Sequence, residues 1–330
     1  MKHLLPATSF FKANLHTHTT ITDGKLSPEE VKEAYKARGY QILCLTDHNV
    51  AVDHSDMNEP DFLMLTGLEV NINEPGLTAS LGKTYHLNLI AKRPDNLWSP
   101  SKAYHWLNAS PYEEKMCFEE MPLRYDPEFV NTLIAKSNEK GFLVSYNHPV
   151  WSCQSYPDYA PLKGLWAMEL CNAACVIQGY SENNAHVYRD LLNLGNRLYP
   201  LGTDDMHRPI AIGGSWIQVG ASQLTYDAVI EALEKGDFYM SCGPEIHSLT
   251  LDGNILKITC SDAKGVALES NARFTRQVHA NGETLLQEAE FDLTKFKEVM
   301  EGQENAFIRL TVYAPDGTYA ATRAYFLDEL

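Results

Sequence analysis

Apolar runs of strand length alternate with amphipathic segments of helix length through residues 10–240. The clearest helical signal is "SPEEVKEAYKARG", where Ser27 can act as the N-cap and Glu30 can complete a capping box. Pro28 suits the first helical position, and Gly39 marks the end. Further helices are predicted at about 126–140, 182–194 and 226–235. The strand-like segments are "FKANLH", "QILCLTDHN", "FLMLTGLEVNI", "TYHLNLIAK", "FLVSYNHP", "GLWAMEL", "RLYPLGTDD" and "SWIQVG". Such alternation is typical of a mostly parallel sheet with helices packed outside it.

Two stretches interrupt this alternation. Residues 92–125 are rich in Pro, Trp and Tyr and have no clear period. An irregular segment of that length inside an α/β domain is more often functional than idle, so we predict a lid or pocket wall, with a packed surface excursion as the alternative. From Gly243 onward, short strands separated by "DG" and "NG" turn signals predict a β-sandwich. The expected organisation is an α/β domain over residues 1–242, with an insertion at 92–125, followed by a β-sandwich over 243–330 whose role no motif indicates.

Composition restricts the partners more than it restricts the fold. The net charge of −16 leaves no basic face for a polynucleotide, which proteins bind largely by neutralising its phosphates. No apolar run approaches the roughly 20 residues that cross a bilayer, and the N-terminus lacks the pattern of a signal peptide. The seven cysteines are scattered and odd in number, which favours reduced thiols in the core. We therefore expect a cytoplasmic protein without a membrane partner, and no feature indicates its oligomeric state.

Polar side chains that can bind metals follow the predicted strands, mostly where each strand ends. His16 and His18 lie one residue apart in "NLHTHTTITDG", and in an extended segment they point the same way. The other candidates are Asp23, Asp47, His48, Glu69, His86, His148, Glu169, Asp205 and His207. Because the C-terminal strand ends of a closed α/β barrel meet on one face, we expect these side chains to converge there. His86 is the exception, since it lies early in its predicted strand.

Six histidines and three or four carboxylates on one face would form a nitrogen–oxygen site suited to divalent metals. One ion takes about four to six ligands, so about nine ligands predict two or three ions, some sharing a bridging carboxylate. Manganese, iron and zinc are the candidate metals. Without a metal, carboxylates crowded together should repel one another and have raised pKa values.

Taken in order, "HTHTTITDG", "LTDHN", "GLEV", the lone His86, "NHP" and "GTDDMH" resemble the motifs of PHP (polymerase and histidinol phosphatase) domains. The resemblance extends over residues 10–240, and the ordered set is far more specific than any single motif. It implies an α/β fold, a distorted (β/α)7 TIM-like barrel, with a centre of two or three divalent metal ions that hydrolyses phosphate esters.

The resemblance also assigns nine of the candidate side chains to three ions. The first set is His16, His18, Glu69 and Asp205. The second set is Glu69, His86 and His148, so that Glu69 would bridge two ions. The third set is Asp23, His48 and His207. Some family members have a histidine where this chain has Asp23, and this difference bears on the occupancy and identity of the third metal.

The function that the resemblance implies is a metal-dependent phosphoesterase, in which a metal-bridging hydroxide attacks phosphorus and Glu69, Asp205 and His207 lie at the reacting centre. Arg208 follows His207 directly and is either a phosphate clamp or an outward, solvated arginine. A branch of the superfamily with a similar barrel and β-tail includes a carbamate-ester hydrolase. Hydrolysis of a non-phosphate ester or carbamate is therefore one alternative, and a non-catalytic metal-binding or interaction protein is another.

Several neighbours of the proposed ligands have roles that the sequence leaves open. Asp47 is placed to orient a ligand, or it is an aspartate of a loop or helix cap. Glu169 could be a ligand, an orienting partner or a general acid. The three asparagines that flank strand ends could contact substrate or form turns: Asn49, Asn147 and Asn172.

Charge and aromatic content favour a small substrate. An acidic surface repels polyanions over roughly 8 Å at physiological salt, whereas cations buried in the mouth of a barrel attract an anion that has entered. The insertion contains aromatic residues predicted to narrow that mouth and to pack against an organic group, namely Trp98, Tyr104, Trp106 and Tyr112. We therefore expect a small anionic substrate, a phosphate ester that can bear a ring, and we do not expect a nucleic acid polymer or a nuclease function.

Overall fold

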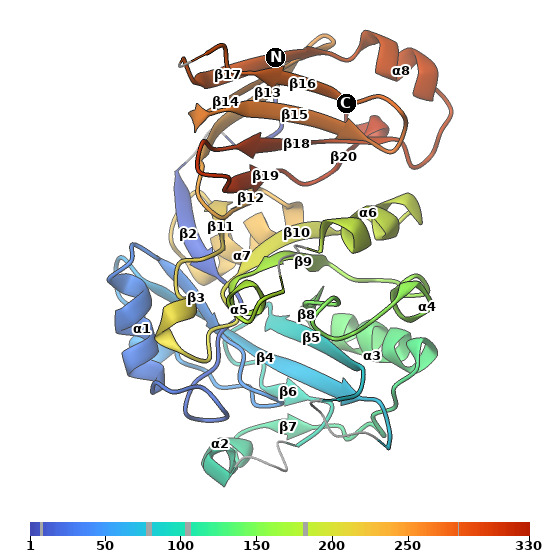
Figure 1. The fold of residues 1–330 in the computed structure, drawn as a ribbon. Helices are drawn as coiled ribbons and strands as arrows, with labels where there is room; N and C mark the ends of the chain where they lie inside the picture. Colours follow the sequence, from blue (N-terminus) through green and yellow to red (C-terminus); the bar gives the residue numbers. More distant parts are fainter. Residues whose placement is uncertain (7–8, 77–80, 103–106, 181–183, 283) are drawn as a thin grey trace.

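The computed structural model describes residues 1–6, 9–76, 81–102, 107–180, 184–282 and 284–330 (Figure 1). The fold is mixed α/β, with a large curved sheet and helices in one part and a β-rich C-terminal part beside it. The large sheet begins with the strands β2 (Phe10–Asn14), β3 (Ile42–Leu45), β4 (Leu63–Asn73), β5 (Thr84–Ala91), β8 (Phe142–Tyr146), β9 (Ala167–Asn172), β10 (Tyr199–Thr203), β11 (Trp216–Gly220) and β12 (Phe238–Ser241). Their spatial order is β10-β9-β8-β5-β4-β3-β2-β11-β12.

The sheet consists of two parallel blocks on either side of an inverted strand. Strands β2, β3 and β4 are parallel, and so are β8, β9 and β10. Strand β5 is antiparallel to both of its neighbours, β4 and β8. The long strand β4 serves both arrangements, because Leu63–Thr66 pair with β3 whereas Gly67–Asn73 pair with β5. The prediction of a mostly parallel sheet therefore holds for the blocks but not at β5, nor at β11, which is antiparallel to both β2 and β12.

The large sheet curls back on itself without closing. Strand β10 lies against β11 and β12. Just past the strands, Thr17 and Met206 form a parallel β-bridge, and the backbone N–H of Asp205 donates to the carbonyl of His16 over 3.0 Å. Along the strands themselves, no ladder of hydrogen bonds joins β10 to β11 within the described residues. The curvature brings the ends of both parallel blocks to one face, although this sheet is not a closed barrel.

The helices lie outside the sheet, and three of the longer ones begin within about one residue of the predicted position. The longer ones are α1 (Pro28–Lys36), α3 (Pro127–Glu139), α6 (Ala185–Asn193) and α7 (Tyr226–Lys235). Ser27 and Glu30 form the predicted capping box of α1, and the side chain of Asp126 caps α3. Apolar side chains such as Leu133 of α3 and Leu233 of α7 belong to the main core against the sheet. Residues 182 and 183, which we included in the third predicted helix, lie outside the described residues.

The C-terminal residues form two sheets over a second apolar core. The first sheet has the order β1-β13-β14-β17 and contains β1 (Lys2–His3), β13 (Ile246–Asp252), β14 (Ile255–Ala263) and β17 (Leu286–Asp292). The remaining strands are β15 (Gly265–Ser270), β16 (Arg276–His279), β18 (Phe307–Tyr313), β19 (Tyr319–Ala321) and β20 (Tyr325–Phe326), and the helix is α8 (Thr294–Met300). These strands extend the large sheet, because β19 pairs with β12. The expected division at 242/243 therefore does not separate the hydrogen-bonded sheets, and Leu5 from the N-terminus packs in the second core.

The insertion over residues 92–125 contains, where described, short elements packed near the first loop of the chain. They are the parallel strands β6 (Trp98–Ser99) and β7 (Cys117–Phe118), the 3-10 turn η2 (Leu107–Ala109) and the helix α2 (Ser110–Glu113). Tyr112 packs against a small apolar cluster of Ile21, Val50 and Ala109. The side chain of Asn108 donates to the carbonyl of Thr20 over 2.9 Å. This part of the insertion therefore covers the loop that follows β2.

At least one aromatic residue of the insertion is buried in the core and does not line an opening for substrate. Trp98 is only 3% exposed and packs in the main core, 5.9 Å from the ring of Phe142. The prediction that Trp98 offers a face to the substrate was therefore wrong, since its indole fills the core beneath the insertion. Tyr104 and Trp106 lie outside the described residues.

Two broader expectations concern the membrane and the thiols. Among the described residues, no helix is both long enough and apolar enough to span a bilayer. All seven cysteines are free thiols, of which Cys117 and Cys153 are exposed, so not every thiol belongs to the core as expected.

Candidate metal centre

The nine predicted ligands lie together at one edge of the large sheet. They are His16, His18 and Asp23 after β2, His48 after β3, Glu69 in β4, His86 in β5, His148 after β8, and Asp205 and His207 after β10. We expected Glu69 to end its strand, but it lies inside β4, just past the part that pairs with β3. His86 lies near the start of β5, and because β5 is inverted, its start meets the ends of the parallel strands. The inversion of β5 therefore explains the apparent exception at His86.

The carboxylate of Glu69 lies at the middle of the centre and contacts five histidines. Its Oε1 atom is 3.0, 3.2 and 3.5 Å from ring nitrogens of His86, His16 and His148, respectively. Its Oε2 atom is 3.2 and 3.4 Å from ring nitrogens of His48 and His18. The two oxygens thus face different histidines, which is the arrangement that a carboxylate bridging two cations requires.

Asp205 faces Glu69 across the first two histidines. Its Oδ1 atom is 3.2 Å from Nε2 of both His16 and His18. The backbone at Asp205 has φ of 48°, and that at His148 has φ of 24°. Non-glycine residues adopt positive φ at a cost, and such strain is concentrated at functional sites. The two turns hold these side chains toward the centre.

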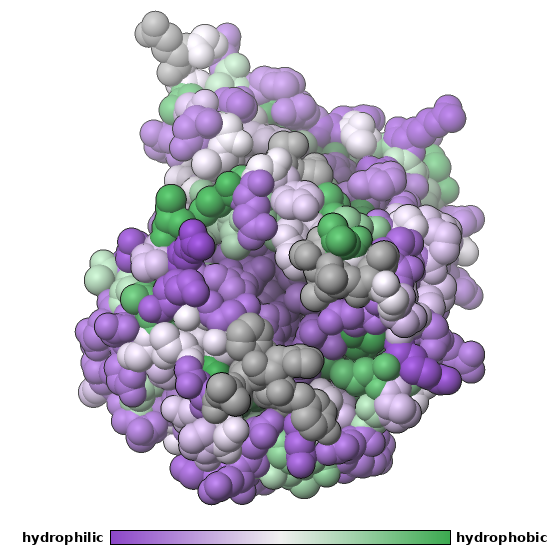
Figure 2. All heavy atoms as spheres, turned by 60° about the horizontal axis from the view of Figure 1, so that its bottom comes forward, coloured by the Kyte–Doolittle hydropathy of each residue, from purple (hydrophilic) through white to green (hydrophobic). Residues whose placement is uncertain are grey.

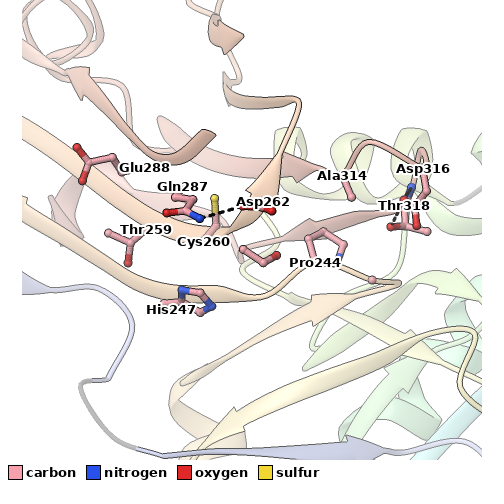
Figure 3. A pocket seen from close by; sticks show the side chains of 12 residues that line it. Pro244, His247, Thr259, Cys260, Asp262, Gln287, Glu288, Ala314, Asp316 and Thr318 are labelled. Carbon is pink, nitrogen blue, oxygen red and sulfur yellow. Dashed lines mark hydrogen bonds between the residues drawn. The ribbon is translucent and has the colours of Figure 1, made fainter. Parts of the chain in front are cut away.

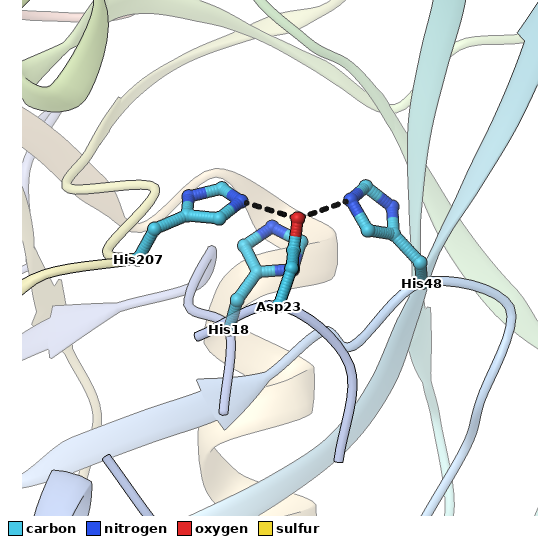
Figure 4. A group of neighbouring side chains, drawn as sticks. All are labelled: His18, Asp23, His48 and His207. Carbon is cyan, nitrogen blue, oxygen red and sulfur yellow. Dashed lines mark ion pairs between the residues drawn. The ribbon is translucent and has the colours of Figure 1, made fainter. Parts of the chain in front are cut away.

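A more exposed group of ligands surrounds Asp23 (Figure 4). Its Oδ2 atom is 3.2 Å from Nε2 of His207 and 3.5 Å from Nε2 of His48, and its Oδ1 atom is 3.5 Å from Nδ1 of His18. The side chains of His207 and Asp23 are 35% and 28% exposed, whereas His16 and His18 are fully buried. Solvent therefore reaches the centre from the side of Asp23 and His207.

The ligand atoms form four overlapping groups in which all atoms lie within 4.8 Å of one another. The groups are His18, Asp23, His48 and His207; His16, His18 and Glu69; His16, His148 and Asp205; and Glu69, His86 and His148. The last group equals the second predicted set, and the first equals the third predicted set with His18 added. The first predicted set is divided between the two groups that contain His16.

Alternating carboxylates and imidazoles determine the charge state of the centre. Burial opposes the protonation of His18, but its hydrogen bonds with Asp205 and Glu69 raise its pKa to about 10. Burial would also raise the pKa of Glu69, but the histidines around that carboxylate hold its pKa well below the usual range. The pKa of Asp205 is low for the same reasons. The expected rise in the carboxylate pKa values was therefore wrong, because each carboxylate lies against histidines and not against another carboxylate.

The residues present fit divalent cations. Imidazole nitrogen and carboxylate oxygen together suit zinc, iron and manganese. Nδ1 of His18 is buried and makes no hydrogen bond within the described part of the chain, although buried polar atoms are normally satisfied. A cation would satisfy this atom, and bound cations would replace the protons that the histidines otherwise hold.

Glu169 orients His16, and both of its carboxylate oxygens take part in hydrogen bonds. Its Oε1 atom is 2.6 Å from Nδ1 of His16 and accepts a hydrogen bond of 2.7 Å from Thr203. Its Oε2 atom accepts from the backbone N–H of His148 over 3.0 Å and from Nδ2 of Asn172 over 2.9 Å. Of the three roles that the sequence left open, these contacts favour the orienting partner, because Nδ1 of His16 faces Glu169 while Nε2 faces the centre.

Two asparagines hold carboxylates of the centre in place. Nδ2 of Asn147 donates to Oε1 of Glu69 over 2.8 Å. Nδ2 of Asn172 donates to Oδ2 of Asp205 over 3.1 Å, while its Oδ1 atom caps the helix α5 (Ala173–Ile177). Both side chains are buried, so they support the ligands and are not open to substrate. Sequence reasoning had offered only a substrate contact or a turn for them.

Asp47 secures the loop that carries Asp23. Its carboxylate accepts hydrogen bonds of 2.9 and 2.8 Å from the backbone and hydroxyl of Thr19, and one of 2.6 Å from Thr22. Within the described residues, this carboxylate has no hydrogen bond to a proposed ligand. Of the roles that the sequence left open for Asp47, these contacts favour the loop aspartate, because it fixes the loop between His18 and Asp23.

Two further residues border the centre. Arg208 is exposed at the start of the 3-10 turn η3 (Pro209–Ala211) and has no ion-pair partner among the described residues. Trp151, which sequence reasoning missed, lies with its ring 5.0 Å from that of His148 and 5.6 Å from that of His86. The available signal was an aromatic residue three positions after the histidine in "NHPVW".

The molecule has more than one hollow on its surface. The face in Figure 2 is hollowed near its middle, where hydrophilic side chains gather. Another hollow, of about 830 Å³, lies in the C-terminal part and is lined by His247, Cys260 and Asp262, among others (Figure 3). Among the described residues, none of the potential metal-binding groups includes these side chains. Size alone therefore does not identify the site, and we assign the chemistry to the metal centre.

Two comparisons match parts of the chain to known proteins. Residues 14–158 match the model of the PHP domain family, and this range contains seven of the nine predicted ligands, with Asp205 and His207 beyond it. A 5'-3' exoribonuclease of Haemophilus influenzae is 35% identical over 69 residues, which are 20% of this chain and 25% of that protein. The chain thus spans about a quarter of this curated relative.

Solved structures resemble the chain more distantly. A two-domain protein of Bacteroides vulgatus, containing a predicted PHP-like metal-dependent phosphoesterase, has 15% identity and a TM-score of 0.46 over 97% of this chain and 96% of that one. A lesion-specific endonuclease of Pyrococcus furiosus has 13% identity and a TM-score of 0.42 over 68% of this chain and 56% of that one. Residues 14–158, which supply seven of the proposed ligands, therefore resemble the PHP domain family.

Proposed function

We propose that this protein is a metal-dependent phosphoesterase that hydrolyses a small phosphate ester with two or three divalent ions of manganese, iron or zinc. The observation that carries the proposal is the position of Glu69, whose two carboxylate oxygens face different histidines in overlapping ligand groups. A single structural role would not require this many buried ionisable groups at one edge of a sheet. Hydrolysis at adjacent divalent ions does require them.

The surrounding residues would fix the ligands for that reaction. Divalent ions held there would lower the pKa of a bound water and neutralise charge on a phosphoryl group. Glu169 keeps Nε2 of His16 directed into the centre, and Asn147 keeps Oε1 of Glu69 in place. The ester would enter beside Asp23 and His207, where the centre is most exposed. No serine or cysteine nucleophile is needed.

The proposal predicts a preference for small esters over polymers. A net charge of −16 disfavours a long polyanion, whereas one phosphate can approach cations at the exposed side of the centre. Because one relative is named an exoribonuclease, the panel should contain phenyl phosphate, nucleoside monophosphates and single-stranded DNA and RNA. After chelation and return of Mn²⁺, we expect kcat/KM for a small ester to exceed that for either polymer by about tenfold or more, equivalent to about 1.4 kcal/mol.

Three results would contradict this proposal. Faster cleavage of the polymers that persists at raised salt would show that the charge argument selects the wrong substrate class. Metal-dependent turnover of carboxyl esters or carbamates, without turnover of any phosphate ester, would favour the alternative hydrolase. Bound metal without turnover of any ester would favour the non-catalytic alternative.

Arg208 is proposed to contact the phosphate. It is exposed, lies next to His207, and has no ion-pair partner within the described residues. Replacement by alanine is expected to raise KM for phosphate monoesters by about tenfold, equivalent to about 1.4 kcal/mol, with little change in kcat. The same replacement of Arg276, exposed in β16, is the control. Unchanged KM for Arg208→Ala in steady-state assays would show that Arg208 is only a solvated arginine.

A further inference from the structure

A pocket adjoins the metal centre. It has a volume of about 350 Å³, and its lining includes Asn49, Asn71, Ser101, Lys102 and Met121. Asn49 directly follows His48, and its backbone N–H donates to the carbonyl of Glu69 over 2.8 Å. The pocket therefore borders the backbone of two proposed metal ligands, His48 and Glu69.

The pairing of β4 with β5 places the pocket on the same sheet face as the metal ligands. Side chains alternate along a strand, so Asn71 points to the same face as Glu69, two residues before it. Asn71 is also directly opposite His86 in the ladder. Cross-strand partners share a face, so the row that begins at Glu69 and His86 continues outward to Asn71.

A chain of hydrogen bonds fixes the amide of Asn71. The hydroxyl of Ser101 donates to Oδ1 of Asn49 over 3.0 Å, and Nδ2 of Asn49 donates to Oδ1 of Asn71 over 2.8 Å. Asn49 adopts φ of 58°, a strained conformation of the kind that is concentrated at functional sites. Nδ2 of Asn71 has no acceptor among the described residues, and the side chain is only partly buried. An oriented donor therefore remains available to a ligand.

The rest of the lining indicates the chemistry of that ligand. Lys102 and Glu120 carry opposite charges 3.8 Å apart, so this pair adds no net charge for a second anionic group. Met121 and Leu123 add apolar surface. An uncharged organic group with an apolar face and a hydroxyl or carbonyl oxygen would complement such a surface.

We propose that this pocket receives the organic group of the ester, and that Asn71 determines specificity by donating from Nδ2 to an oxygen of that group. The inference rests on the proposed phosphoesterase function and extends it to the substrate. Asn71 contacts the part of the substrate that does not react, so its loss should affect KM more than kcat.

The test compares two esters that share the phosphate. Apart from the ester oxygen, phenyl phosphate has no oxygen on its ring, whereas uridine 5'-phosphate has hydroxyl and carbonyl oxygens. We expect Asn71→Leu to raise KM for uridine 5'-phosphate by about tenfold while KM for phenyl phosphate and both kcat values stay within about twofold. Asn193→Leu, at an exposed position at the end of α6, is the control. Elemental analysis and thermal melting of each variant verify that the centre and the fold are intact.

A binding measurement separates this inference from the proposed function. Calorimetric titration with uridine, which has no phosphate, should show binding to the parent protein that Asn71→Leu weakens by about tenfold. If neither ester is hydrolysed but uridine binds in this way, the result supports the pocket inference and contradicts the proposed phosphoesterase function. If phenyl phosphate is hydrolysed but Asn71→Leu changes both esters equally or not at all, the pocket inference fails. Absence of uridine binding to the parent would also overturn it.

Discussion

Glu69→Gln is expected to reduce hydrolysis by about 1,000-fold or more, equivalent to about 4 kcal/mol of transition-state stabilisation. The replacement keeps the size of the side chain but removes the negative charge that five histidines surround. It also places an amide N–H₂ group where Asn147 now donates to Oε1, or where a cation would bind to Oε2. The measurement is kcat/KM on whichever small ester gives the fastest turnover.

Asp23→Asn provides the internal comparison for this result. Asp23 contacts only the exposed group of ligands, so its loss should cost about 10- to 100-fold. Glu74→Gln makes the same chemical change just past the end of β4, outside the centre, and should leave the activity nearly unchanged. Equal activity of Glu69→Gln and the parent, with an intact fold, would count decisively against a bridging carboxylate.

The candidate site could be predicted from the sequence because its ligands depend mainly on local features. His16 and His18 follow an apolar strand, as do His48 and His148, and the ends of neighbouring strands meet at one edge. The position of His86 could not be explained in this way. It depends on the inversion of β5, which follows from its antiparallel pairing with β4 and β8. The hydrophobic period of a strand does not reveal which strands it pairs with or in which direction.

The roles of the supporting residues also depended on distant contacts. Glu169 contacts His16, 153 positions away, and this contact separates an orienting role from that of a ligand. Asn147 reaches Glu69 across 78 positions. Trp98 looked like a surface aromatic within an irregular segment, but its neighbour Phe142 lies on another strand. Composition and spacing do not specify such contacts.

Sequence patterns predicted the helices better than the arrangement of sheets. α7 spans Tyr226–Lys235 as predicted, because its apolar period and the following glycine are local signals. The turn signals after Gly243 indicated strands but not their partners. β19 pairs with β12, so the C-terminal strands continue the large sheet where a separate unit was expected. The N-terminal strand β1 pairs with β13, which no nearby signal could have indicated.

Metal removal is expected to destabilise the folded protein strongly. Ligand groups of the folded state are dispersed in the unfolded chain, so cations bind the folded state preferentially. At 1,000 times the dissociation constant, one bound ion stabilises the folded state by about 4.1 kcal/mol, and an unfolding entropy of about 2.1 cal/mol/K per residue means that each kcal/mol shifts the Tm of a 330-residue chain by about 1.4 °C. Chelated protein should therefore melt at least about 6 °C below protein reconstituted with Mn²⁺ or Zn²⁺. A variant such as Glu74→Gln should show the same difference.

The most direct test of the central claim is the number of metal ions per chain. Elemental analysis should be made on protein purified without chelators and again after chelation, reconstitution and removal of free metal. The four overlapping ligand groups predict at least two equivalents in the parent and a loss of at least one in Glu69→Gln. Less than one equivalent in the reconstituted parent would contradict the assignment of these residues as a metal centre.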